Sequence, residues 1–235
     1  MESTGGNETI VMTATFSAPA TPTLVVRDED ERIHQYLCAM LSWARPRHVR
    51  RLVFGENSNT AFDFSKVVGR LERVGKEVEV LVFDGNQEAP LLGKGYGEGK
   101  ILEYLYKNSR LLNAAPAFYK VTGRLFVSNF DLVSEATPGL NAFRFKRWKD
   151  GRRPKIIMRC FKCSRQLFES RLIDAYKGAD DRTGVQIEHV YFDRLNGLPI
   201  PDFGVKPAMV GQSASTGEML EPYDDAIIRE ARSLM

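Results

Sequence analysis

Cysteine is scarce in this chain, and its scarcity excludes some kinds of site. The 235 residues include Cys38, Cys160 and Cys163, too few for a disulfide framework. Cys160 and Cys163 form a CxxC pair, but no nearby histidine or cysteine pair completes a structural zinc site. The pair also follows an apolar strand, whereas a thioredoxin-like CxxC opens a helix. We interpret both residues as ordinary thiols.

Long apolar runs and a strong net charge are also missing. No run approaches the roughly 20 apolar residues that a membrane-spanning helix needs. The N-terminal sequence MESTGGNETIVMTATFSAP lacks the basic-then-apolar order of a secretory signal. The net charge is only +3, which does not favour a protein dedicated to nucleic acid. We therefore expect a cytoplasmic protein with no nucleic-acid partner.

Positive charge is nevertheless concentrated in one stretch, residues 144–171, where only Asp150 and Glu169 oppose it. Such a stretch suits phosphates, nucleic acid or an anionic membrane surface, and we predict peripheral membrane contact through it. The alternative is a solvated loop beside a strand. The basic residues include Arg144, Lys146, Arg147, Lys149, Arg152, Arg153, Lys155, Arg159, Lys162 and Arg165.

Short apolar runs alternate with segments of helical periodicity over the first half of the chain. Strand–helix alternation of this kind demands a parallel sheet with helices on both faces, so we predict a doubly wound, mostly parallel α/β fold. The expected strands are 9–16, 50–59, 77–86 and 117–130, the last interrupted at Gly123, and the expected helices are 28–43, 64–74 and 101–112.

The pattern loosens beyond residue 130, but it still fits one domain. We expect a strand at 155–161, helices at 164–176 and 184–195, and an ordered loop at 199–217 that covers the site as a lid. The predicted organisation is a disordered N-terminus over 1–9, a single domain over 10–221, and a C-terminal helix or tail over 222–235.

Polar residues follow each of the first three predicted strands. In open α/β sheets, ligands bind beyond the carboxyl ends of the strands, so these residues would line one rim of the sheet. Asp84, Gly85 and Asn86 follow the third strand. From the first two strand ends and the turn before the next helix, we assign these residues to nucleotide binding: Thr13, Ala14, Thr15, Arg27, Glu56, Asn57 and Ser58.

A glycine-rich segment, GKGYGEGK at 93–100, precedes the third predicted helix. We predict a loop whose backbone N–H groups and Lys94 bind phosphate at the helix N-terminus. It is not a Walker A loop, because Ile101 follows Lys100 where serine or threonine is required. The alternative is a flexible helix-entry loop. Lys94, Gly95, Gly97 and Glu98 are assigned to the donor site.

Two cations lie on one face of the fourth predicted strand. Lys120, Thr122 and Arg124 alternate onto that face, and buried cations are costly without an anion. A diphosphate is a natural partner, so we assign Lys120, Gly123 and Arg124 to it. The alternative is an internal ion pair, for example with Glu98.

Together these motifs resemble a known family. The order VFGENS (53–58), GKGYGE (93–98), FYKVTGR (118–124), IEHVYFDRL (187–195) and VGQSASTG (210–217) resembles small bacterial and viral-type glycosyltransferases with a GT-A fold. Those enzymes commonly serve polysaccharide or lipopolysaccharide pathways. The resemblance covers residues 10–217 and implies a nucleotide-sugar donor, such as a UDP-sugar, and a glycan or lipid-linked acceptor.

The resemblance also exposes a departure. GT-A enzymes usually carry Asp-x-Asp after the fourth strand to hold a divalent metal, whereas this chain has Lys-Val-Thr-Gly-Arg there. Side-chain cations can stabilise the leaving diphosphate in its place. We predict that no cofactor is required; Asp84 or Asp131 would be the alternative ligands for Mg²⁺ or Mn²⁺.

The resemblance points to Glu188, at the start of a late helix, as the base that deprotonates the acceptor hydroxyl. Its rivals Asp180 and Asp181 fit a helix cap and loop better, and we interpret the neighbouring His189 as structural. Other readings are a nucleotidyltransferase-like enzyme, for which metal-binding carboxylates are few, and an RNA- or phosphate-binding module, for which exposed aromatic platforms are missing.

Overall fold

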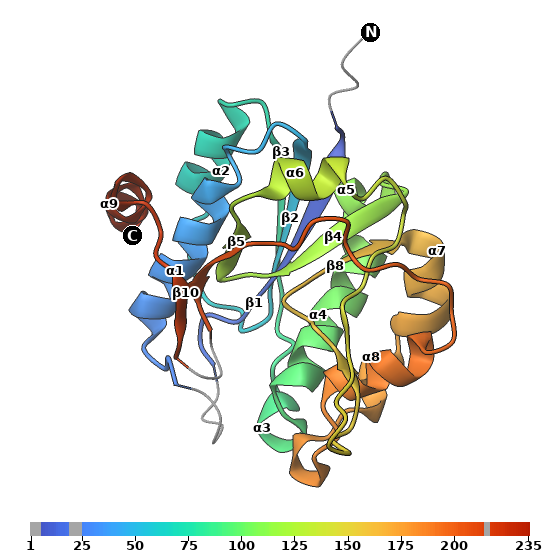
Figure 1. The fold of residues 1–235 in the computed structure, drawn as a ribbon. Helices are drawn as coiled ribbons and strands as arrows, with labels where there is room; N and C mark the ends of the chain where they lie inside the picture. The colour runs from blue at the N-terminus through green and yellow to red at the C-terminus, as the bar shows by residue number, and fades with distance from the viewer. Residues whose placement is uncertain (1–5, 19–24, 214–216) are drawn as a thin grey trace, which may run out of the picture.

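A central five-stranded sheet organises the molecule, seen here in a computed structural model that describes residues 6–18, 25–213 and 217–235. Its strand order is β3-β2-β1-β4-β8, and all neighbours are parallel except β4 and β8. The predicted doubly wound, mostly parallel sheet is therefore confirmed (Figure 1). The strands are β1 (Glu8–Ala14), β2 (Val49–Glu56), β3 (Glu77–Val82), β4 (Ala117–Thr122) and β8 (Cys160–Ser164).

Alternation along β1 builds a core on each face of the sheet. Ile10 and Met12 pack toward α1 (Glu29–Ser42) and α2 (Ser65–Glu72), whereas Val11 packs with the apolar face of α4 (Lys94–Asn108). Successive strand side chains point to opposite faces, so an uninterrupted apolar run serves both cores. The other helices are α3 (Ala89–Leu92), α5 (Arg110–Asn113), α6 (Phe130–Glu135), α7 (Arg165–Leu167), α8 (Ile187–Leu195) and α9 (Asp225–Leu234).

The second half of the chain is more broken than its sequence suggests. The expected strand at 117–130 divides at Gly123 into β4 and β5 (Leu125–Val127), which enters a separate sheet with β9 (Met209–Gln212) and β10 (Met219–Glu221). The expected helix at 164–176 is instead α7, a π-helical turn (Phe168–Leu172) and the start of a 3₁₀ turn (Ala175–Gly178). The expected strand at 155–161 is wrong, because β7 (Lys155–Ile156) pairs with β6 (Phe145–Lys146) while β8 starts at Cys160.

The chain ends fit the predicted organisation only partly. Residues 1–5 of the predicted disordered N-terminus lie outside the described residues, but Glu8 and Thr9 already belong to β1. Residues 222–235 include α9, which packs along α1 (Figure 1). Within the described ranges, no helix is both long and apolar enough to cross a membrane.

Candidate active site

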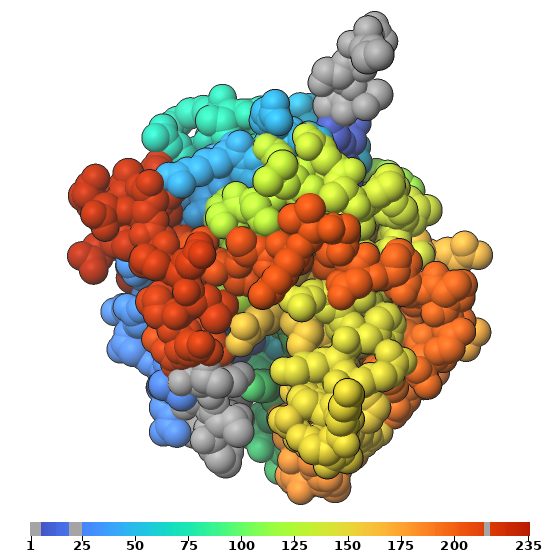
Figure 2. Space-filling view, viewed as in Figure 1, coloured from blue at the N-terminus to red at the C-terminus, as the bar shows by residue number. Residues whose placement is uncertain are grey.

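A cavity of about 520 Å³ opens at the carboxyl ends of β1 and β4. The strand order changes direction here, because β1 is followed along the chain by β2 on one side and lies beside β4 on the other. Such a switch point leaves a crevice between the loops that follow the two strands. Figure 2 shows the surface hollowed beside the yellow segment that contains residues 144–158. This is the rim on which the sequence places the donor site.

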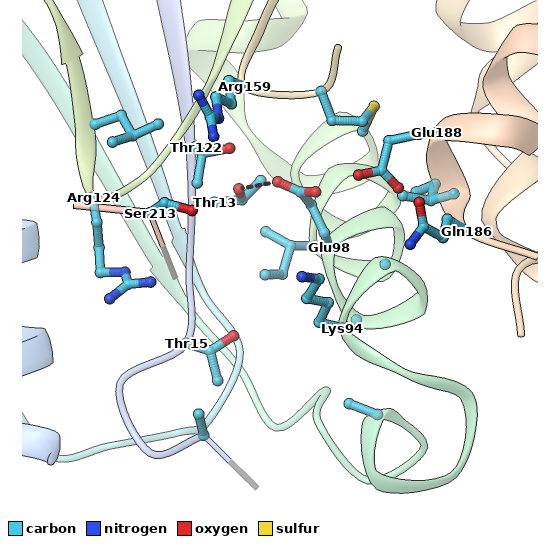
Figure 3. Close-up of a pocket in the computed structure, with 18 of the residues that line it drawn as sticks. Thr13, Thr15, Lys94, Glu98, Thr122, Arg124, Arg159, Gln186, Glu188 and Ser213 are labelled. Carbon is cyan, nitrogen blue, oxygen red and sulfur yellow. Dashed lines mark hydrogen bonds between the residues drawn. The ribbon is translucent and has the colours of Figure 1, made fainter. Parts of the chain in front are cut away.

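The end of β1 supplies hydroxyls to the cavity. Thr13 and Thr15 both line it, and the Thr13 hydroxyl donates to Glu98 at 3.1 Å (Figure 3). The Thr15 hydroxyl donates to the Asn57 side-chain oxygen at 2.6 Å. Ala14 lies between them on the opposite face and is buried in the core. The two threonines therefore face the cavity, and Ala14 does not.

Residues after β2 support the loop that follows β1. Glu56 is fully buried and accepts hydrogen bonds from the backbone of Phe16 and Ser58, both at 2.9 Å. The Ser58 hydroxyl donates to the same Glu56 carboxylate. Neither these residues nor Asn57 is among those that line the cavity, and the exposed Arg27 is not either. Glu56, Asn57 and Ser58 thus support the loop after β1 without lining the cavity.

The predicted glycine-rich loop is wrong, because this segment is the first part of helix α4. Gly95 and Gly99 allow close packing: an added Cβ would lie 2.9 Å from the Ile187 side chain and 2.1 Å from the Tyr176 Cβ, respectively. These glycines let α4 approach the later part of the chain, a packing use that glycine's missing side chain permits. Gly95 and Gly97 still line the cavity, but on a helix face.

The N-terminus of α4 already has an acidic neighbour. Asp181 accepts a hydrogen bond from the backbone of Lys94, and an added Cβ at Gly93 (φ 100°) would lie 2.1 Å from its carboxylate. Burial raises the pKa of Asp181, while Lys94 opposes that rise. A carboxylate at this place complements the helix dipole. Asp181 thus caps α4, whereas the sequence predicts that Asp180 and Asp181 cap the element after them; Asp180 does so, accepting from the Arg182 backbone.

Lys120 lies behind the cavity and pairs internally. Its side chain is fully buried and forms an ion pair with Glu98, and its ammonium also donates to the Met158 carbonyl at 2.7 Å and to the Thr122 hydroxyl at 3.2 Å. These acceptors use the three donors of the ammonium group. Lys120 does not line the cavity, so the internal ion pair is the arrangement found.

Arg124 lines the cavity and has no carboxylate within ion-pair distance among the described residues. Its side chain is 2% exposed, and its guanidinium donates to the Gln35 side-chain oxygen at 2.8 Å. It lies 5.9 Å from the centre of the Tyr36 ring. Burial lowers the pKa of Arg124, because desolvation disfavours the charged form. An anion in the cavity would relieve this cost.

Arg32 is a second buried cation in the same wall, and sequence reasoning missed it. It packs over the Tyr36 ring from 5.9 Å. Its guanidinium donates to the carbonyls of Thr15, Phe16 and Val26, which shapes the loop after β1. A basic residue next to the apolar face of α1 was the available signal. Arg32 adds positive potential beside Arg124, but its guanidinium N–H groups already donate to these backbone carbonyls.

Glu188 faces the cavity from the first turn of α8, across from Glu98 (Figure 3). Burial raises its pKa, and the Glu98 charge adds to the rise, while a hydrogen bond from its own backbone N–H and the charges of Lys155 and Lys94 oppose it. No hydrogen bond from a described side chain neutralises it. A carboxylate with a raised pKa is a stronger proton acceptor than an ordinary glutamate.

Its neighbour His189 has a structural position. The His189 Nδ1 accepts from the backbone N–H of Gln186 at 3.2 Å, which closes a capping box at the start of α8. Burial lowers the pKa of His189. This arrangement fixes the helix start, and with it the direction of Glu188.

Several further lining residues were not predicted from the sequence. They come from segments that are distant along the chain, and although the sequence groups Thr122 with β4 and the cations with the basic stretch, no local pattern brings these groups to one cavity. Those outside the predicted set include Tyr36, Thr122, Lys146, Lys155, Arg159, Gln186 and Ser213.

The end of β4 does not fit the divalent metal that GT-A enzymes commonly hold there. Thr122 offers one hydroxyl, Arg124 is a cation, and the nearby Glu98 is paired with Lys120. Asp131, one predicted alternative ligand, accepts from the backbone N–H groups of Arg47 and His48. Asp84 is not among the lining residues. The described residues contain no group of three or more histidine, cysteine or acidic side chains arranged to hold a metal ion.

Comparison with known proteins identifies the architecture. A scan against protein-family models finds no match, and a search of curated proteins finds none. Among solved structures, the glycosyltransferase GlyE of Streptococcus pneumoniae TIGR4 aligns with a TM-score of 0.52 at 14% identity. The galactosyltransferase LgtC, solved with donor and acceptor sugar analogs, aligns with a TM-score of 0.53 at 10% identity. The fold is GT-A-like.

The extent of these alignments differs. The alignment with LgtC includes 97% of this chain and 96% of LgtC. The alignment with GlyE includes 84% of this chain but only 45% of GlyE, so this chain spans less than half of that protein. At such low identities the likeness establishes the GT-A-like fold alone. Within this fold, the cavity lies at the carboxyl ends of β1 and β4, the edge of an open α/β sheet at which ligands bind.

Proposed function

We propose that this protein is a glycosyltransferase that moves a sugar from a nucleoside-diphosphate sugar to a glycan or lipid-linked saccharide, as in polysaccharide assembly. One observation carries the proposal. A single cavity at the switch point of a GT-A-like sheet places a buried guanidinium without a carboxylate partner, Arg124, and a carboxylate of raised pKa, Glu188, on different walls (Figure 3).

The leaving diphosphate is proposed to bind near Arg124, with Lys94 contributing from α4. Guanidinium donors in a partly enclosed site stabilise negative charge that develops as the bond to the sugar breaks. This takes the place of a divalent ion, in agreement with the poor fit of the β4 end to a metal. Lys120, originally assigned to the diphosphate, instead holds Glu98 in its ion pair.

The β1 end and Glu98 are proposed to position the donor. Thr13 and Thr15 present hydroxyls to the cavity, and Arg32 holds the backbone between them and α1. Glu98 uses one oxygen, Oε1, for both Thr13 and Lys120. Its other oxygen has no hydrogen-bond partner among the described residues, so it can accept from a hydroxyl of the donor sugar and orient that sugar.

Glu188 is the proposed base of an inverting transfer. The acceptor hydroxyl attacks the anomeric carbon, its proton passes to the Glu188 carboxylate, and the bond to the diphosphate oxygen breaks with its electron pair. The raised pKa of Glu188 suits it to take that proton. Glu98 cannot replace it, because its charge is held by Lys120.

Thermal-shift measurements with UDP-, GDP-, CMP- and dTDP-linked sugars, each with and without EDTA, test the proposal. A ligand at 100 times its Kd stabilises the fold by about 2.7 kcal/mol, which is roughly 5–10 °C for a domain of this size. We expect one nucleotide class to give such a shift and EDTA to leave it unchanged. Absence of any shift, or a strict Mn²⁺ requirement, would contradict the donor assignment or the metal-free site, respectively.

A further inference from the structure

The densest positive charge on the chain lies in a β-hairpin at the rim of the cavity. Residues 144–155, here called the basic hairpin, contain β6 and end at the first residue of β7; the two strands pair Phe145 with Ile156 and Lys146 with Lys155. Lys146 and Lys155 also line the cavity. In Figure 2 this yellow segment stands beside the hollow. Whatever binds the hairpin is therefore next to the cavity mouth.

Most of the hairpin's charge is not neutralised by the protein. Seven lysines and arginines lie in this segment against the single acidic residue Asp150. Arg144, Arg152 and Arg153 pair with Asp202, Asp150 and Asp193, respectively. The other four cations have no ion-pair partner among the described residues: Lys146, Arg147, Lys149 and Lys155. A solvated cluster of this density attracts an extended anionic surface.

Trp148 lies within this cluster, between two of its cations. The Lys146 ammonium is 5.1 Å and the Arg152 guanidinium 4.8 Å from the centre of its ring. The side chain is half-buried, at the tip of a hairpin that turns through Gly151 (φ 82°). An indole flanked by lysine and arginine is the composition that favours the boundary between water and lipid headgroups.

Apart from the exposed Arg171, the other cations of the basic stretch are buried, hydrogen-bonded or at the cavity. Lys162 is 4% exposed and pairs with Glu8, Arg165 bonds to the Asn113 carbonyl, and Arg159 lines the cavity. The predicted contact surface at 144–171 thus narrows to the hairpin. Its single partly exposed tryptophan, packed under cations, does not provide the row of stacking platforms that single-stranded nucleic acid uses.

We propose that the basic hairpin docks the protein on the surface of a bilayer rich in anionic phospholipid, with the cavity mouth facing the lipid headgroups. The cations bind the headgroup phosphates, and Trp148 sits at their level. That the acceptor is a lipid-linked saccharide depends on the proposed function, whereas docking on the bilayer does not. A bilayer that carries the acceptor would then present it at the Glu188 side of the cavity.

Sedimentation with vesicles tests the docking. Each cation near an anionic bilayer contributes about fivefold to partitioning, so the double variant Lys149→Glu/Arg152→Glu should bind 70:30 phosphatidylcholine:phosphatidylglycerol vesicles at least about 25-fold more weakly. Trp148→Ala should weaken binding several-fold. Wild-type binding should vanish on pure phosphatidylcholine, and also in 1 M salt, where the screening length is about 3 Å.

The matched control is Lys66→Glu/Arg73→Glu, which makes the same charge change on the exposed side of α2. It should bind vesicles within about twofold of the wild type. Both double variants should keep their thermal shift with the nucleotide sugar, which separates docking from the donor site. Three results would overturn the proposal. They are an equal loss of vesicle binding in the two double variants, equal binding to anionic and neutral vesicles, and binding of the wild type to heparin but not to anionic vesicles.

Discussion

At the Glu98 end of the cavity, buried charge is paired within the protein, whereas at the Arg124 end it is not. Lys120 and Glu98 neutralise each other with further hydrogen bonds from Thr13 and to Met158. Arg124, only four residues later, has the neutral Gln35 as its hydrogen-bond partner. The cation of the first region therefore needs no ligand to balance its charge, whereas we expect a bound anion to stabilise the cation of the second.

The largest expected effect concerns Glu188, which faces Glu98 across the cavity (Figure 3). Glu188→Gln should lower the transfer rate by about 10²- to 10⁴-fold, because general-base catalysis contributes on that scale. Nucleotide affinity should stay unchanged, since the variant keeps the size of the side chain. Steady-state kinetics and calorimetric titration with the donor measure the two quantities. Retained turnover would remove Glu188 from the proposed mechanism.

The same variant has an opposite effect on stability. Because burial and Glu98 raise the pKa of Glu188, its contribution to folding is present at low pH and is lost as pH rises through the folded-state pKa. Glu188→Gln should therefore melt higher than the wild type at neutral pH, and the gain should disappear at a pH below the usual glutamate pKa of about 4.3. Glu72→Gln, at an exposed position on α2, is the control and should show no such gain.

Breaking the paired region should chiefly affect folding. Lys120→Met leaves Glu98 without its cation, and loss of one partner of a buried pair costs roughly 3–5 kcal/mol. We expect a fall of this size in the free energy of unfolding, measured by urea denaturation. In the double variant Lys120→Met/Glu98→Leu most of the loss should be recovered. If the single variant kept wild-type stability, the pairing would not be structural.

Changing the unpaired region should instead affect binding. Arg124→Met should weaken nucleotide affinity about 10- to 100-fold, because hydrogen bonds to charged groups contribute roughly 1.5–3 kcal/mol. Its unfolding free energy should change less than that of Lys120→Met, since a buried cation without a carboxylate is costly. Arg124→Lys, which keeps the charge but loses the planar fork, should lie between. Calorimetric titration with the nucleotide sugar measures these affinities. An unchanged affinity of Arg124→Met would show that the diphosphate binds elsewhere.

Sequence patterns predicted the central sheet and its rim because these depend on local periodicity. The apolar run of β1 and the polar residues that end it identify both the strand and its ligand edge. The fate of each cation was not predictable in this way. Lys120 and Arg124 have similar local contexts, and only packing against Glu98 and Gln35 separates them.

The prediction of a loop for the glycine-rich segment was wrong because distant contacts, and not local sequence, determine its structure. Each glycine inside a helix costs about 1 kcal/mol relative to alanine, so local propensity favours a loop. Contacts of Gly99 with Tyr176 and of Gly95 with Ile187, which lie 77 and 92 residues further along the chain, override that preference because there is no room for a side chain at either glycine. Glu188, by contrast, was predicted through the family resemblance, and its cavity-facing position agrees with that prediction.

Gly123 limits what this site can become. Its N–H donates to the Thr13 carbonyl at 3.1 Å, and an added Cβ would lie 2.4 Å from that same oxygen. Any side chain at position 123 would force the ends of β1 and β4 apart, next to the proposed donor site. A metal-binding carboxylate is thus sterically shut out of this position, so evolution or protein engineering would have to rebuild two strand ends together to place one there.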